Sequence, residues 1–169
     1  MKLKIIKSLT LIGTLLFSFS ALALKNDTQQ PINITSDNQS LDLEKNIVTF
    51  SDNVVITQGS ILINADKVTI IRPADNGGGK EKIEALGNPV TFQQQLDNGK
   101  PINGRASKVN YDLGSEYLIL TGNAQLKQLD SQIDAEVITY DVKQQKMIAK
   151  NSGKGRVKTI LYPSQLQQK

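Results

Sequence analysis

Apolar and polar residues alternate along most of the chain with a period of two. The alternating runs are rich in β-branched residues and stand at positions 32–34, 41–43, 54–56, 61–63, 68–70, 109–111 and 118–120. Such alternation is typical of half-buried β-strands. No stretch beyond the first 23 residues keeps the 3.6-residue period of an amphipathic helix. The sequence therefore predicts an all-β, antiparallel fold.

Two sequence signatures recur and keep step with each other. The first is an asparagine, spaced 35 residues apart at Asn53, Asn88 and Asn123. The second is a small residue followed by a polar residue and an alternating run, and it begins at Ser36, Ala65, Ala106 and Ala135. We interpret the asparagines as turns between short strands in a unit that is stacked about four times, giving about sixteen short strands. A stack of this kind has unpaired strands at both ends.

The first 23 residues are predicted to be a cleaved signal peptide. Three lysines precede an apolar run over residues 8–19, and Ala21 and Ala23 form a small-residue cleavage signal. The apolar run is shorter than the roughly 20 residues that span a bilayer. Residues 24–169 then form a single domain of an exported protein.

Removing the signal peptide changes the charge balance. The whole chain has 20 basic and 16 acidic residues, and without the three signal lysines 17 basic residues remain against 16 acidic ones. Aromatic residues make up 5% of the chain, and tryptophan is absent. Because a nucleic-acid-binding surface needs a basic face and stacking aromatic rings, we expect no nucleic-acid partner.

Residues that carry chemistry are scarce. Cysteine and histidine are absent, which removes the usual nucleophile–base pairs and the usual transition-metal ligands. The glycines at 77–79 precede Lys80, but no Ser or Thr follows that lysine as a phosphate-binding loop requires. The sequence therefore predicts no enzyme, with no catalytic residues, no metal site and no cofactor.

Acidic pairs leave one alternative function open. Two nearby carboxylates can act as acid and base on a sugar. The pairs are Asp42 with Glu44, Glu81 with Glu84, and Asp130 with Asp134. A periplasmic sugar-binding or glycan-processing β-protein is therefore the alternative, although acidic residues on strands more often form a solvated face.

The apolar residues of the alternating runs all point to one side of the predicted sheet. A closed β-sandwich and a groove for lipid acyl chains produce the same pattern along the sequence. Branched aliphatic side chains dominate this face, which suits flexible acyl chains because they need a smooth apolar wall. The pattern alone leaves both interpretations open.

Five motifs, in order along the chain, carry a resemblance to a known family. They are residues 30–34 (QPINI), 64–68 (NADKV), 97–101 (DNGKP), 120–124 (LTGNA) and 163–167 (PSQLQ). Through them, essentially the whole mature chain resembles the LptA or organic-solvent-tolerance-A-like family, the periplasmic bridge proteins of lipopolysaccharide transport. The resemblance implies a β-jelly roll shaped like an open V with a hydrophobic interior.

The same resemblance implies a function and partners. The protein is expected in the periplasm, where it would bind lipopolysaccharide by its lipid A acyl chains. It would conduct the lipid from the inner to the outer membrane in a head-to-tail oligomer of its own copies. An inner-membrane-anchored transport partner is expected at the N-terminal edge, and an outer-membrane translocon partner at the C-terminal edge.

Site residues follow from the apolar pattern and the resemblance together. The lipid-binding residues are expected to be Thr28, Ile32, Ile34, Leu43, Phe50, Ile56, Ile63, Phe92, Tyr111, Leu113 and Leu120. The partner-joining edges are expected to be Pro31, Ile32, Asn33 and Ile34 at one end and Lys158, Thr159, Ile160 and Leu161 at the other.

Overall fold

The computed structural model of the protein describes residues 27–73, 80–151, 153 and 155–162. The predicted signal peptide, the glycines at 77–79 and the motif at 163–167 lie outside these residues. The described chain has one short 3₁₀-helix, η1 (Asp27–Gln29), and ten strands. The strands are β1 (Ile32–Thr35), β2 (Asn38–Asp42), β3 (Ile47–Gln58), β4 (Ile61–Ile71), β5 (Lys82–Gln95), β6 (Pro101–Asp112), β7 (Tyr117–Gln128), β8 (Ser131–Asp141), β9 (Lys146–Lys150) and β10 (Lys158–Ile160).

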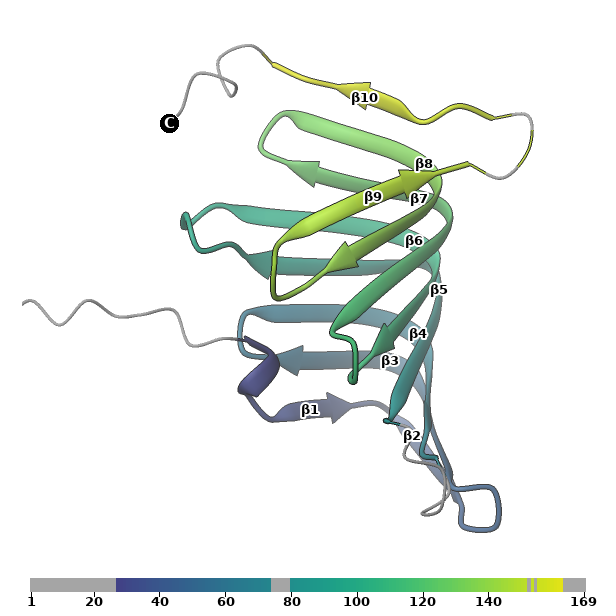
Figure 1. Ribbon diagram of the computed structural model, residues 1–169. Helices are drawn as coiled ribbons and strands as arrows, with labels where there is room; N and C mark the ends of the chain where they lie inside the picture. Colours follow the sequence, from purple (N-terminus) through teal and green to yellow (C-terminus); the bar gives the residue numbers. More distant parts are fainter. Residues whose placement is uncertain (1–26, 74–79, 152, 154, 163–169) are drawn as a thin grey trace, which may run out of the picture.

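All ten strands belong to one antiparallel sheet, as predicted. Its order is β1-β3-β4-β5-β6-β7-β8-β10, with β2 also paired to β3 and β9 also paired to β8. Within the described ranges no helix is long and apolar enough to cross a membrane. The first and last strands lie at opposite ends of the stack, so the sheet is open and not closed into a barrel (Figure 1).

The sheet is folded over on itself because each long strand bends midway (Figure 1). We call the half that contains β1 and β10 the first layer, and the half that contains β2 and β9 the second layer. The line of bends is the corner, and the opposite, open side between the hairpin tips is the mouth. Each ladder between neighbouring long strands shifts register at the corner, for example between Ser51 and Val54 on β3 and between Leu86 and Val90 on β5.

The recurring signatures of the sequence mark this corner. Asn53 and Asn123 have positive φ angles of 51° and 50° and lie inside β3 and β7, not at hairpin turns as predicted. The prediction was wrong on this point because left-handed backbone is needed both in turns and in bends of this kind, and asparagine tolerates it in either place. The structure has ten strands where about sixteen short ones were predicted, because β3 to β8 each run through the corner as one long strand.

Polar contacts join neighbouring strands along the corner, where the ladder is interrupted. The amide of Asn53 donates to the Asp37 carboxylate at 2.6 Å. The backbone N–H of Asn88 donates to the carboxylate of Asp66 at 3.1 Å. The hydroxyl of Ser107 donates to the carbonyl of Gly122 at 3.3 Å. The second and third of these contacts satisfy backbone groups that lie within the register shifts.

The hydrophobic core lies between the two layers. In most long strands the buried positions continue on the same inner face after the corner; β4 buries Ile61 and Ile63 before it and Val68 after it. Burying each large apolar side chain contributes about 1.5–3 kcal/mol. At the two ends of the stack, Ile32 and Ile34 on β1 and Ala149 on β9 are only partly buried against this core. The apolar interior therefore reaches both ends of the sheet.

Candidate functional site

Most of the predicted lipid-binding residues share the interior between the layers. Ile56, Ile63 and Phe92 come from the first layer. The second layer supplies Phe50, Tyr111 and Leu120. All six are buried in one cluster, and Phe92 is only 2% exposed. The structure thus brings these residues together, in a closed state in which the interior is filled by side chains.

The other predicted lipid-binding residues lie at the margins. Ile32, Ile34 and Leu113 are partly buried and pack against the core, and Thr28 lies in η1. Leu43 is 77% exposed in the hairpin turn after β2, so it does not join the interior. The alternation that placed it inward ends at the turn, where the chain reverses.

Hydrogen bonds between the layers close the mouth. The Tyr111 hydroxyl in the second layer donates to the side-chain oxygen of Gln58 in the first layer at 2.9 Å. The Tyr140 hydroxyl donates in the same way to Gln94 at 2.8 Å. We call these two glutamine–tyrosine pairs the latch. Each is buried, so each is strengthened by the low dielectric around it.

Asp27, in η1, fills the mouth beside the latch. Its carboxylate accepts the backbone N–H and the hydroxyl of Ser60, both at 2.7 Å, and the amide of Gln94 at 2.9 Å. Gly59 has a φ of +60°, and a Cβ there would lie 2.3 Å from a carboxylate oxygen of Asp27. The hairpin between β3 and β4 therefore needs a glycine to accommodate the carboxylate.

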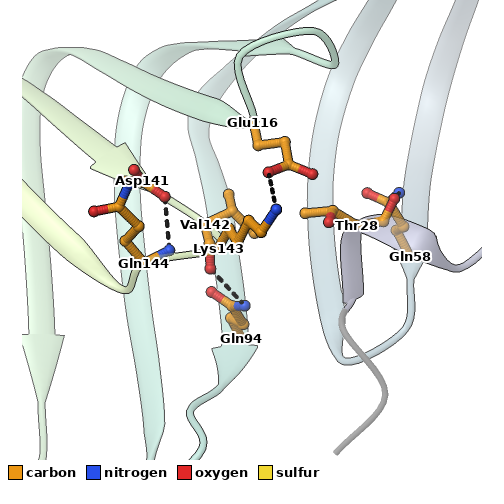
Figure 2. Close-up of polar contacts among 8 residues, drawn as sticks. All are labelled: Thr28, Gln58, Gln94, Glu116, Asp141, Val142, Lys143 and Gln144. Carbon is orange, nitrogen blue, oxygen red and sulfur yellow. Dashed lines mark hydrogen bonds and ion pairs between the residues drawn. The ribbon is translucent and has the colours of Figure 1, made fainter.

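The latch glutamines also tie η1 and a second-layer tip into the mouth (Figure 2). The Gln58 amide donates to the carbonyl of Thr28 at 3.3 Å and to that of Gln30 at 3.1 Å. The Gln94 amide also donates to the Val142 carbonyl at 3.4 Å, across the mouth. Thr28, which was predicted to bind lipid, thus lies in the mouth.

Sequence reasoning missed Asp27, Gln58, Gln94 and Tyr140 as site residues. The sequence did indicate that Gln58 faces inward, because it follows Val54 and Ile56 at every second position of β3. Nothing in the local sequence marks Asp27, since its partners lie more than thirty residues away.

The latch makes stability sensitive to alkaline pH. Burial, with the nearby carboxylates of Glu116 and Asp27, raises the pKa of Tyr111 to about 12. Burial also raises the pKa of Tyr140. Because the folded-state pKa is raised, the protonated tyrosines stabilise the fold fully at pH values below their ordinary pKa of 10.0. This contribution is lost as the pH rises through about 12.

We therefore expect the midpoint of thermal unfolding to fall between pH 10 and pH 12, measured by circular dichroism. Replacing both latch tyrosines, Tyr111→Phe with Tyr140→Phe, should flatten this fall because no phenolate then has to be buried. Tyr117→Phe is the control, since Tyr117 is exposed. An equally steep fall in the double variant would contradict the assignment.

The acidic residues of the alternative sugar-processing function have local partners. Glu81 pairs with Arg72 at 3.0 Å, and Glu84 pairs with Lys108 at 2.5 Å. Hydrogen bonds from the amides of Gln125 and Gln132 hold the pKa of Asp134 below its usual value. Across the described ranges, no group of three acidic, histidine or cysteine residues is placed to hold a metal ion. Glu81, Glu84 and Asp134 thus each have a charged or hydrogen-bonding partner on the sheet.

Fold and site together define a β-jelly-roll protein with an apolar interior between two layers and an open edge at each end. The family described as LptA/(LptD N-terminal domain) LPS transport protein matches residues 33–146 of the chain. The lipopolysaccharide export system protein LptA of Haemophilus influenzae is 65% identical over 168 residues, covering 99% of this chain and 98% of that protein. The chain belongs to this family of lipopolysaccharide-transport proteins, which confirms the resemblance found in its motifs.

Other relatives agree. LptA of Escherichia coli K12 is 53% identical over 152 residues, covering 90% of this chain and 82% of that protein. The crystal structure of LptH from Pseudomonas aeruginosa, described as the LptA-homologous periplasmic component of the lipopolysaccharide transport device, superposes with a TM-score of 0.73 at 22% identity. The match covers 82% of this chain and 100% of LptH. It confirms the predicted fold.

Proposed function

We propose that the protein binds lipopolysaccharide by the acyl chains of its lipid A, between its two layers. We further propose that it conducts the lipid from the inner to the outer membrane as one unit of a head-to-tail bridge. The observation that supports this is the apolar interior, which runs through the stack and reaches both ends, at Ile32 and Ile34 on one side and Ala149 on the other.

As a member of its family, the protein is a periplasmic, non-enzymatic component of lipopolysaccharide transport. The physical task of such a component is to keep acyl chains out of water, at a cost of about 0.8 kcal/mol for each exposed methylene. An interior that accepts the chains and leaves sugars and phosphates at the mouth removes this barrier. Similar interiors in a row make successive steps nearly equal in free energy.

Loading requires the two layers to separate. The interior side chains fill the space between the layers, with Phe92 and Tyr140 in ring contact at 5.7 Å. The corner is continuous backbone, whereas the mouth is held by side-chain hydrogen bonds. We therefore infer that acyl chains enter at the mouth, where the latch opens while the corner acts as the hinge.

The edge strands supply the joint between copies. Among the described strands, β1, β2, β9 and β10 each have one pairing partner and leave one edge open. In the first layer β1 runs from mouth to corner and β10 from corner to mouth, and in the second layer β2 and β9 also run in opposite directions. The end of one copy can therefore pair antiparallel with the start of the next in both layers at once.

This joint is directional, because it uses two different ends. A contact between unlike surfaces that does not close into a ring propagates as a filament. The two ends also allow two different partners. We propose that an inner-membrane-anchored partner pairs at residues 31–34 and that an outer-membrane translocon partner pairs at residues 158–161. All three residues of β10 are exposed, which leaves that edge accessible.

Photocrosslinking tests the lipid path. Phe50 and Thr49 are neighbours on β3, and their side chains lie on opposite faces of the sheet. We expect a photoreactive phenylalanine analogue at position 50 to crosslink lipopolysaccharide at least about tenfold more than the same analogue at position 49, because alternate residues of a strand face opposite sides. Equal yields from two folded variants would contradict a lipid path between the layers.

A further inference from the structure

A buried carboxylate in the mouth is not explained by the proposed lipid path alone. Asp27 is 9% exposed, and three donors from the first layer converge on its two oxygens. The donors are the backbone N–H and the hydroxyl of Ser60 and the side-chain amide of Gln94, and all of them are neutral. Converging N–H and O–H groups without a counter-charge form a general site for an anion.

We propose that this donor set binds a phosphate on the sugar headgroup of the transported lipid, and that Asp27 occupies the site until the lipid arrives. The inference rests on the proposed function and names the headgroup feature that opens the mouth. Carboxylate and phosphate are both anionic acceptors that form short, charge-assisted hydrogen bonds. Two anions cannot share these donors because like charges repel, so η1 leaves the mouth as the phosphate enters.

The site lies where an amphiphile would place its charge. Gln94 donates to Asp27 and accepts the hydroxyl of Tyr140, and the Tyr140 ring contacts Phe92 in the interior. Two side chains thus separate the anion site from the apolar wall. A lipid with acyl chains beside Phe92 has its headgroup at the mouth, within reach of Ser60.

Occupancy of the site is coupled to the latch. When the phosphate replaces Asp27, the amide of Gln94 exchanges the carboxylate for the phosphate as its acceptor, while the side-chain oxygen of Gln94 still accepts the Tyr140 hydroxyl. Movement of η1 also removes Thr28, whose carbonyl accepts the amide of Gln58. The exchange of anions therefore weakens the half of the latch that contains Gln58. A ligand that favours the open mouth in this way shifts the protein toward that state.

Two variants open the mouth by different routes. Asp27→Asn keeps the side-chain size but turns one acceptor into a donor that faces Ser60 and Gln94. Gly59→Ala keeps the Asp27 carboxylate and all three donors. The new Cβ would lie 2.3 Å from an Asp27 oxygen, so it should push the Asp27 side chain out of the mouth. Asp66→Asn is the matched control, because the Asp66 carboxylate also accepts a backbone N–H, but at the corner.

The experiment measures the affinity of the full secreted chain for bisphosphorylated lipid A and for the same lipid without phosphates. Binding is followed by crosslinking at position 50. Asp27→Asn and Gly59→Ala should bind both lipids about tenfold more tightly, the factor that corresponds to one charged hydrogen bond. Asp66→Asn should match the unsubstituted protein. In the Asp27→Asn background, Ser60→Ala should lower the preference for the phosphorylated lipid about tenfold, because one phosphate donor is lost.

Three results would overturn the inference, and they differ in what else they overturn. If the two lipids bind equally and Ser60→Ala has no effect, Asp27 only holds the mouth closed and no phosphate binds at its site. The proposed lipid carriage is then unaffected. A shift of the Ser60 amide resonance with inorganic phosphate, alongside equal lipid affinities, means that the site takes free phosphate and not a headgroup. Failure of either lipid to crosslink in the folded protein overturns the proposed function as well.

Discussion

Replacing Ile34 by glutamate should abolish lipid transport while leaving the protein folded. Ile34 lies at the start of the stack, partly buried, where the interior reaches the end of the sheet. Its loss from the core costs about 1 kcal/mol, a part of the value for full burial. A carboxylate in the path of acyl chains, by contrast, opposes each passing chain by several kcal/mol of desolvation (about 2–7 for a polar group). The measurement is rescue of a depleted strain, with folding checked by circular dichroism.

Two further variants make this result specific. Thr35→Glu adds the same charge one residue away on the outward face, where Thr35 is exposed, and should leave transport intact. Phe92→Glu should unfold the protein, because loss of the buried ring alone costs about 3–5 kcal/mol and total stabilities are only about 5–15 kcal/mol. Full rescue by a folded Ile34→Glu variant would remove the lipid path from this end of the stack.

The sequence predicted the class of fold and its interior well, because both follow from local alternation. Residues such as Ile56, Ile63 and Leu120 face inward on the strands that their period of two indicates. The folding of one sheet into two layers was not deduced from the residues. Asn53 requires the same left-handed backbone in a bend as in a turn, and the choice between the two depends on pairing partners far along the chain.

The closed mouth was beyond prediction for the same kind of reason. Gln94 meets Asp27 across 67 residues and Tyr140 across 46, so neither contact leaves a local pattern. Leu43 shows the opposite error, since its local pattern continued after the strand had ended. Alternation along a strand identifies the face on which a side chain lies. The partners of buried polar groups, by contrast, depend on which distant strands the folded sheet brings together.

Removing residues 152–169 should abolish self-assembly at one end while preserving the fold. This deletion removes β10, which is exposed throughout and pairs with β8 alone among the described strands. The first layer would then be one strand short, so an incoming copy could not pair with both layers at once. We expect the truncated protein to remain monomeric by light scattering at concentrations where the full chain forms long oligomers.

Mixing provides the test of direction. Truncated chains still have β1 and β2, so they should join the free β9–β10 end of a full-length filament and stop its growth there. Mean filament length should fall as the fraction of truncated chains rises. Deletion of residues 163–169, which keeps β10, is the control and should leave the length unchanged. Long filaments formed by the truncated chain alone would rule out this joint.

The 35-residue spacing of the corner asparagines makes the length of the proposed conduit a modular quantity. Each strand contacts its immediate neighbours, so the stack behaves as a nearly one-dimensional array. Inserting a complete strand pair with its own corner would lengthen the interior without altering either terminal strand. Reach can thus be set within one chain, by duplicating hairpins, or between chains, by adding copies. A large gap can then be spanned by repetition of one short, easily folded segment.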